Sequence, residues 1–216
     1  MSPILEAIVT ACGGILAGLA AAGPLVWHQQ RIVSRWRYLA HHDDTTGLPN
    51  RRALLNALSR ALRDRDGDRV GLIVLDLDGF KAINDQFSHQ GGNDVLTVVG
   101  QRLAALIEPV HMAARLSGDE FALLVAGDSN HLAWAASAAW RQISRDPIPV
   151  AGTFRRISAS VGYASAEPGT TAAQLLHAAD IAMYEAKTTR SSIHAAPVTK
   201  TCPSRHGRRY RDLPRP

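Results

Sequence analysis

The sequence predicts an α/β fold, an α+β sandwich in which helices pack on a mixed β-sheet, preceded by one transmembrane helix. Three observations support this prediction. Apolar runs typical of buried strands alternate with stretches of helical periodicity, two strand-like segments are joined by a tight turn, and residues 7–27 carry no charge. With 216 residues, the chain can form one mid-sized domain and short appendages.

The uncharged segment is long enough to span a bilayer as a helix, which places a transmembrane anchor at residues 1–27. Trp27 marks a membrane interface, and the arginines that follow it put the C-terminal side in the cytoplasm. A cleaved signal peptide with its small-residue site at Ala20–Ala22 is the alternative, and it is disfavoured because the start of the chain contains Glu6 and no Lys or Arg. The predicted location is therefore the cell membrane, with lipid contacted by a single-pass helix.

The rest of the chain divides into a linker, a domain and a tail. Ile32, Trp36 and Leu39 recur at helical spacing, so residues 28–42 are predicted to form a helical linker. Asn50 is expected to cap the first helix of a domain that covers residues 43–193. The expected helices are 51–64, 79–86, 92–107, 130–144 and 171–189, and the expected strands are 69–77, a hairpin over 112–126, and 155–165.

Residues 194–216 are predicted to form a basic, disordered tail. Six basic residues and one acid in this tail account for the whole net charge of +5. Binding of anionic lipid head groups is the alternative for the tail. The domain has balanced charge and no basic face with interleaved aromatic residues, so no nucleic-acid partner is expected. The two cysteines, Cys12 and Cys202, cannot form a metal site by themselves.

Carboxylates follow two of the predicted strands. Asp76 ends an apolar run, and Asp78 has the same parity and lies on the same face. Ser117 and Gly118 are expected to form a two-residue turn, after which Asp119 and Glu120 lie on opposite faces, so that one of them can meet Asp76. Carboxylates at strand ends hold Mg²⁺ against a nucleotide phosphate. The alternative is that an Asp caps the helix near Lys81.

Several motifs together resemble the GGDEF family of diguanylate cyclases, which join two GTP molecules into cyclic di-GMP. They are Asp43–Arg52, Asp76–Asn93, Ser117–Phe121 and Ala182–Lys187, in the order that the family has them. The resemblance covers residues 43–191. It implies a nucleotidyl-cyclase-like fold, a divalent cofactor (Mg²⁺, which Mn²⁺ could replace), GTP as substrate, and a homodimer in which each protomer supplies half of the site.

The resemblance also implies roles for individual residues. Asp76, the Leu77 carbonyl and Asp119 are implied to hold the metal, and Glu120 is a further candidate ligand. Asp119 is implied as the base that deprotonates the attacking ribose hydroxyl, and Lys81 as a stabiliser of transition-state charge. The implied substrate contacts are Asn84, His89, Asn93 and Lys187, with Arg190 as the nearest candidate for a second phosphate-binding cation.

The chain departs from the family pattern at several of these positions. Ser117 replaces the first glycine of the signature, where it is expected to fit a type II turn, and Ser88 replaces another glycine. Asn93 stands where the family has an Asp that accepts hydrogen bonds from guanine. Arg190 comes one place early, with Ser191 at the expected position. Glu108 and His111 replace the arginine and aspartate of the inhibitory site of the family, so no product inhibition is expected there.

The expected function is therefore that of a dimeric, Mg²⁺-dependent diguanylate cyclase that releases pyrophosphate. Two alternatives follow from the departures. One is a catalytically degenerate domain that serves as a nucleotide-binding or scaffold module. The other is a cyclase with relaxed purine specificity, because Asn93 offers guanine one acceptor where Asp would offer two.

Overall fold

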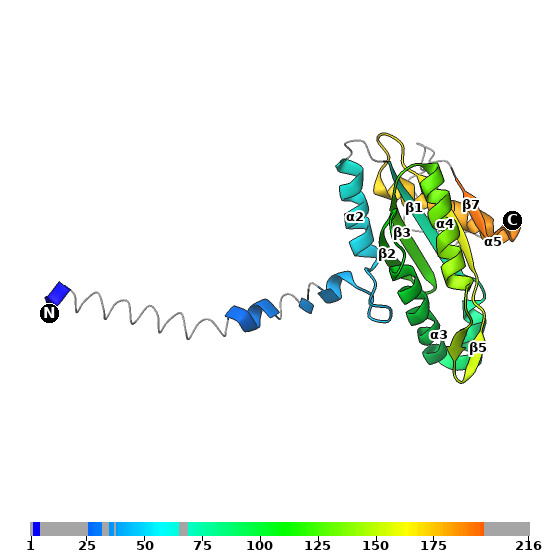
Figure 1. The fold of residues 1–216 in the computed structure, drawn as a ribbon, viewed down its shortest axis with the longest axis horizontal. Coiled ribbons are helices and arrows are strands. Elements are labelled where there is room, and N and C mark those ends of the chain that lie inside the picture. Colours follow the sequence, from blue (N-terminus) through cyan, green and yellow to red (C-terminus); the bar gives the residue numbers. More distant parts are fainter. Residues whose placement is uncertain (1, 5–25, 32–34, 37, 65–68, 197–216) are drawn as a thin grey trace. The chain divides into compact units, whose positions relative to one another are not determined.

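The computed structural model describes residues 2–4, 26–31, 35–36, 38–64 and 69–196 of the chain. The chain divides into two units, Met1–Ala40 and His41–Pro216, which are described separately (Figure 1). In the first unit, each described residue from 26 to 40 is helical, in agreement with the predicted helical linker. The Arg31 guanidinium lies 4.4 Å from the centre of the Trp27 ring, which is exposed.

Most of the predicted membrane anchor and of the predicted basic tail lies outside the described residues. Only the last two positions of the segment 7–27 belong to the described residues. Within the described ranges, no helix combines the length and the apolar character that crossing a membrane requires. The tail beyond residue 196 also lies outside the description, so the anchor and most of the tail stay predictions.

Five strands form the central sheet of the second unit, in the order β2-β3-β1-β6-β7. Neighbouring strands are antiparallel except β6 and β7, which pair in parallel. β1 lies in the middle and is buried along its whole length, as its apolar run predicted. The bounds are β1 Val70–Leu77, β2 Val110–Ser117, β3 Glu120–Ala126, β6 Ala159–Ser165 and β7 Ile193–Ala195.

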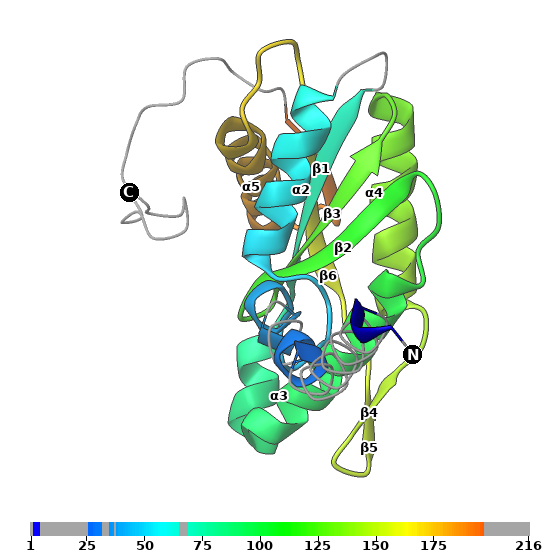
Figure 2. The ribbon, with the colours of Figure 1, turned by 90° about the vertical axis from the view of Figure 1, so that its left-hand side faces the viewer.

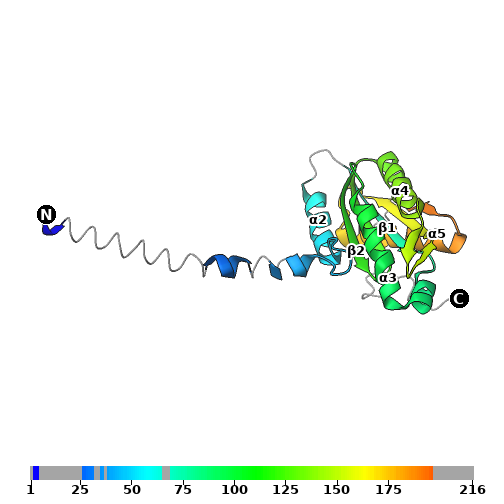
Figure 3. The same cartoon turned by 60° about the horizontal axis from the view of Figure 1, so that its bottom comes forward.

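Helices cover both faces of this sheet (Figure 2). Along β1, Leu72 and Val74 join one core and Ile73 and Leu75 join the other, because successive side chains of a strand point to opposite faces. α2 also lies beside β2 (Figure 3). This arrangement confirms the predicted mixed sheet flanked by helices. One core is covered by α2 (Arg51–Arg63) and α5 (Ala172–Thr189), and the other by α3 (Phe80–Ala104) and α4 (Ser129–Ser144).

Side-chain caps set the starts of three helices, α2, α4 and α5, and Asp128 caps α4. Asn50 Oδ1 accepts a hydrogen bond from the Ala53 backbone N–H at 3.1 Å, which confirms the predicted start of α2. Thr171 and Gln174 form a reciprocal capping box at the start of α5. These caps satisfy backbone donors that have no partner within the helix.

The predicted boundaries agree with the structure in part. The helices expected at 79–86 and 92–107 correspond to the two halves of α3, which are separated by a bend at the non-helical Ser88, and the second half ends at Ala104. The strand expected at 155–165 is confirmed over β6 (Ala159–Ser165) but begins too early, because Arg155 belongs to β5 (Thr153–Arg155), which pairs with β4 (Ile148–Val150) in a separate hairpin. The domain also continues past residue 193, since β7 includes His194 and Ala195.

β2 forms one edge of the sheet and is irregular. Its register with β3 shifts between Val110 and Met112 and again between Arg115 and Ser117. The loop before α2 approaches this edge, where the Arg115 backbone N–H donates to the Pro49 carbonyl at 2.9 Å. The edge strand is thus bulged and partly paired to a loop.

Candidate active site

The predicted carboxylates gather at the end of the sheet where β1 stops and α3 begins (Figure 2). Asp76 on β1 lies directly opposite Glu120 on β3 and opposite Ser160 on β6. Directly opposite residues of an antiparallel pair share one face of the sheet. All three side chains therefore lie on the face that α5 covers, and all three residues are buried. Glu120, and not Asp119, is the signature residue that shares a face with Asp76.

A lysine from α5 neutralises part of this buried charge. Lys187 Nζ lies 2.5 Å from Asp76 Oδ1, and the Ser117 hydroxyl donates to Glu120 Oε2 at 3.1 Å. The Asp76 side chain is 2% exposed, whereas that of Lys187 is 45% exposed. When both carboxyls are ionised, one ammonium balances only one of the two charges. The pair is therefore suited to a further cation.

Asp78 is held by two serines that the sequence analysis did not identify. Its carboxylate accepts hydrogen bonds from the Ser158 and Ser160 hydroxyls, each at 2.8 Å. The N-cap of α3 is Gly79 in a left-handed conformation with no side-chain cap, so the alternative of a capping Asp is wrong. The available signal was the spacing of Ser158 and Ser160, which places both on one side of an extended segment.

The signature turn differs by one residue from the prediction. Ser117 pairs with Glu120, so the two-residue loop consists of Gly118 and Asp119. Gly118 has a φ of 52°, whereas Asp119 has a negative φ, which is the pattern of a type II′ hairpin and not of the expected type II turn. The Leu77 backbone N–H donates to the Asp119 carbonyl at 3.2 Å. This bond keeps the half-buried Asp119 beside the end of β1.

Arg115 fastens this turn to the loop that opens the domain. Its Nε and Nη2 donate to the Gly118 carbonyl at 3.0 and 2.8 Å, and its Nη1 reaches both carboxylate oxygens of Asp43 at 2.8 and 3.0 Å. Burial raises the pKa of Asp43, but hydrogen bonds from Arg115 and Thr46 outweigh burial and leave the pKa below its usual value. Arg115 is not among the predicted site residues, although its place two residues before the signature was a usable signal.

α3 brings a second group of predicted residues together. Ser88 adopts φ 62° and ψ 175°, and the helix bends there. Asn84, before the bend, lies against Gly92, after it, so closely that a Cβ on Gly92 would be 2.0 Å from Asn84 Oδ1. Asn93 follows directly, and it is exposed, as is His89. The bend therefore places Asn84 next to the segment that carries Asn93.

Two predicted site residues belong neither to the carboxylates at the sheet end nor to the residues around the bend of α3. Lys81 is exposed in the first turn of α3, and Arg190 is exposed at the end of α5. The side chain of neither residue makes a hydrogen bond or ion pair within the part of the chain that the structure describes. Arg190 is the C-cap of α5, with a φ of 55°. Its direction therefore does not follow from helical spacing, which the sequence analysis assumed.

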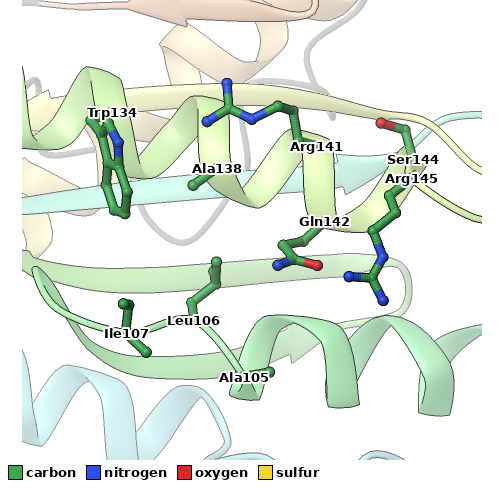
Figure 4. Close-up of a pocket in the computed structure, with 9 residues that line it drawn as sticks. All are labelled: Ala105, Leu106, Ile107, Trp134, Ala138, Arg141, Gln142, Ser144 and Arg145. Carbon is green, nitrogen blue, oxygen red and sulfur yellow. The ribbon is translucent and has the colours of Figure 1, made fainter.

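A groove on the opposite face of the sheet involves none of the predicted site residues (Figure 4). It has a volume of about 660 Å³ and lies between α4 and the end of α3. Trp134 projects from α4 toward Ile107, which is 74% exposed, whereas the Arg141 side chain points away from Ile107 (Figure 4). The predicted chemistry thus belongs to the open end of the sheet and not to this groove.

The residues at the sheet end fit a magnesium ion in part. Among the described residues, no group of three or more His, Cys, Asp or Glu side chains is close enough to hold a metal. Asp76 and Glu120 supply two carboxylates on one face. Mg²⁺ is usually bound by one or two carboxylates together with water and substrate phosphates, and this donor set agrees with that habit.

Two relatives are similar to about two thirds or more of this chain. Diguanylate cyclase TpbB from Pseudomonas aeruginosa is 42% identical over 154 residues, which cover 68% of this chain and 35% of TpbB. Cyclic di-GMP phosphodiesterase PdeR from Escherichia coli is 34% identical over 170 residues, which cover 78% of this chain and 26% of PdeR. The chain thus spans about a quarter to a third of the length of these relatives.

A solved structure shows the same fold. The coiled coil and GGDEF domain of DgcB from Caulobacter crescentus, in complex with c-di-GMP, is 28% identical and superimposes with a TM-score of 0.77 over 84% of this chain and 99% of that one. The family described as "Diguanylate cyclase, GGDEF domain" matches residues 40–192. With the signature turn, the buried carboxylates and the bent α3 in place, the chain belongs to the GGDEF family.

Proposed function

We propose that the protein is a diguanylate cyclase that condenses two GTP molecules into cyclic di-GMP and releases pyrophosphate. The observation that carries the proposal is the buried pair of Asp76 and Glu120, placed beside the signature turn and touched by Lys187. A buried pair of like charges is costly for the fold, so its position at a sheet end is typical of a functional site. The family relationship supports the same activity.

Each residue group has a role in this reaction. Asp76, the Leu77 carbonyl, Asp119 and Glu120 would hold Mg²⁺ or Mn²⁺, which when bound neutralises the charge that develops on the phosphates. Asp119, half-buried beside the exposed Gly118, would accept the proton of the attacking 3′-hydroxyl as a general base. Lys81 and Lys187 would contact phosphate oxygens, with Arg190 as a further candidate. Asn84, His89 and Asn93 would position the nucleoside.

The reaction requires two protomers, because each would bring one GTP to a shared centre. Attack in line on an α-phosphorus needs the second nucleotide opposite the first. We further propose that residues 1–27 anchor the chain in the cell membrane as a single helix that contacts lipid. The domain would then lie on the cytoplasmic side, where GTP is available. Confinement in the membrane plane raises the effective concentration of the two halves.

A second candidate function is a cyclase with relaxed purine specificity. Asn93 favours it, because its amide offers one acceptor and one donor, which matches adenine as well as half of guanine. Asn93 is exposed and directly follows Gly92, which lies against Asn84. A catalytically degenerate domain is the third outcome, and Ser117 at the signature turn is the observation that would fit it.

One experiment distinguishes these functions. The full-length protein, purified in detergent, is incubated with Mg²⁺ and GTP, ATP or both, and the products are resolved by mass spectrometry. We expect cyclic di-GMP from GTP, and its loss by at least about 100-fold in Asp119→Asn, since removing a general base costs that much or more. Retention of the wild-type melting temperature in Asp119→Asn is the control for folding. No cyclic dinucleotide under any condition would refute a cyclase.

A further inference from the structure

We propose that Lys187 is the resident counter-ion of Asp76 in the metal-free protein, and that the ammonium and the metal compete for this carboxylate. Metal binding would release Lys187, and the released ammonium would then be free to bind the triphosphate. The inference rests on the proposed function, because it takes Asp76 to be a metal ligand. The inference adds a coupling between metal binding and nucleotide binding, which does not follow from the separate roles of Asp76 and Lys187.

Asp76 and Lys187 are buried to different extents, and this difference is the first argument for the exchange of the counter-ion. The Asp76 side chain is 2% exposed, so its charge needs a partner within the protein whenever no metal is bound. Lys187 Nζ, 2.5 Å from Asp76 Oδ1, supplies that partner. The Lys187 side chain is 45% exposed, so its ammonium can return to water or move to another anion at little cost. The Asp76 carboxylate thus stays in place, while the Lys187 ammonium can leave it for water or for another anion.

The position of Lys187 on α5 allows this exchange without moving the helix. Ala186 and Met183 are buried in the core beneath α5, which fixes the backbone of the helix. Lys187 lies three residues from the Arg190 cap, in the last turn, where a cation is favoured by the helix dipole. Its long side chain can therefore swing while its Cα stays in place.

Electrostatics makes the two cations antagonists. A divalent ion on Asp76 and an ammonium on the same carboxylate repel each other strongly, because the carboxylate is shielded from water. Glu120, directly across the sheet, would then become the second carboxylate next to the metal. The released ammonium would lie close to the same centre, where a triphosphate supplies new negative charge. Metal and nucleotide should therefore strengthen the binding of each other through Lys187, with equal coupling in both directions.

The test measures metal binding without nucleotide. Mn²⁺ is titrated into the full-length protein, and free Mn²⁺ is followed by electron paramagnetic resonance. We expect Lys187→Met to bind Mn²⁺ about fivefold more tightly or better than wild type, the low end for coupled sites. Without metal, its melting temperature should fall, because Asp76 loses its counter-ion. Saturating Mn²⁺ should restore most of that loss.

Two further variants serve as a control and as an alternative substitution at residue 187. Arg141→Met removes one positive charge from α4 on the opposite face, and it should bind Mn²⁺ as wild type does. Lys187→Gln keeps a hydrogen-bond donor for Asp76 without the charge, and it serves if Lys187→Met fails to fold. A non-hydrolysable GTP analogue should raise the Mn²⁺ affinity of wild type more than that of either Lys187 variant.

The outcomes separate this inference from the proposed function. If Mn²⁺ binds wild type at a site lost in Asp76→Asn, but neither Lys187 variant binds it more tightly, the counter-ion exchange is wrong and the cyclase proposal stands. If Mn²⁺ binds no form of the protein even with the GTP analogue, both are overturned. Tighter binding in Lys187→Met, with Arg141→Met unchanged, supports the exchange.

Discussion

Ser88 has a strained backbone, because its φ of 62° and ψ of 175° lie in a region that glycine occupies almost alone. We expect Ser88→Gly to raise the free energy of unfolding by about 1 kcal/mol or more, because glycine adopts this conformation without steric cost. Urea denaturation measures the change. Ser129→Gly, at the ordinary first position of α4, is the control and should give no gain. Equal or lower stability in Ser88→Gly would contradict the strain.

A second prediction at this scale concerns Asn93. Guanine presents two donors to the residue at this position in the family, and the Asn93 amide can accept only one of them. Asn93→Asp should therefore lower the KM for GTP and improve the preference for GTP over ATP by about tenfold, since an opposed polar pair costs about 1–3 kcal/mol. Competition kinetics with both nucleotides measures the preference.

The matched control for that prediction is Gln86→Glu, which adds a carboxylate at an exposed position of α3 before the bend. It should leave the preference unchanged. If Asn93→Asp gains nothing, the residue does not read the base, and the role implied by the family resemblance fails at this position.

The sequence identified site residues that belong to a motif, but it did not show which residues contact each other when that depends on the fold. It placed Asp119 and Glu120 on opposite faces, but only the pairing of β1 with β3 shows that Glu120 is the one opposite Asp76. The contact of Asp76 with Lys187 joins residues 111 apart in the chain. Arg115 escaped notice because its partner, Asp43, lies 72 residues away.

At the scale of elements, the loop before α2 and the β2–β3 hairpin are held together through Asp43 and Arg115. The pKa of Asp43 lies below its usual value of 3.8, so the folded state favours the ionised carboxylate. The contribution to stability is therefore complete above pH 3.8 and is lost as the pH falls through the lower, folded-state pKa. Above that range, wild type should be more stable than Asp43→Asn by a constant amount.

Urea denaturation between pH 6 and pH 2.5 checks this dependence. The stability difference between wild type and Asp43→Asn should shrink only below about pH 4, where the carboxylate begins to bind protons. Asp44→Asn, one residue further on and exposed, is the control and should follow wild type at each pH. A difference that shrinks already near neutral pH would show that Asp43 is not the group responsible.

The elements themselves were predictable to the extent that they carry a clear period. β1 and α5 were located to within a residue or two, because one is a continuous apolar run and the other has a cap and a long helical pattern. β4 and β5 have three residues each, which is too short for any period to show. The bend of α3 was predicted as a gap between two helices, since neither local pattern reveals that Ser88 alone turns the chain.

For the whole molecule, the proposed reaction depends on bringing two domains together. We expect a protein that starts at residue 41 to show specific activity that rises steeply with protein concentration, because its half-sites meet only by diffusion. The full-length chain in lipid vesicles should show a weaker dependence. Activity assays from nanomolar to micromolar protein measure both. Specific activity of the shortened protein that is constant over this range would count against assembly through the N-terminal segment.

The irregular edge at β2 matters when many of these domains are held close together. A long, regular edge strand is a template for sheet extension between molecules, and β2, at eight residues, is the longer of the two edge strands of this sheet. Its two register shifts and its hydrogen bond to Pro49 break that template, and β7 at the other edge has only three residues. Domains held at high local density can therefore collide repeatedly without polymerising through their strands. Encounters between domains would then stay reversible, which the proposed cyclase would need in order to release its product.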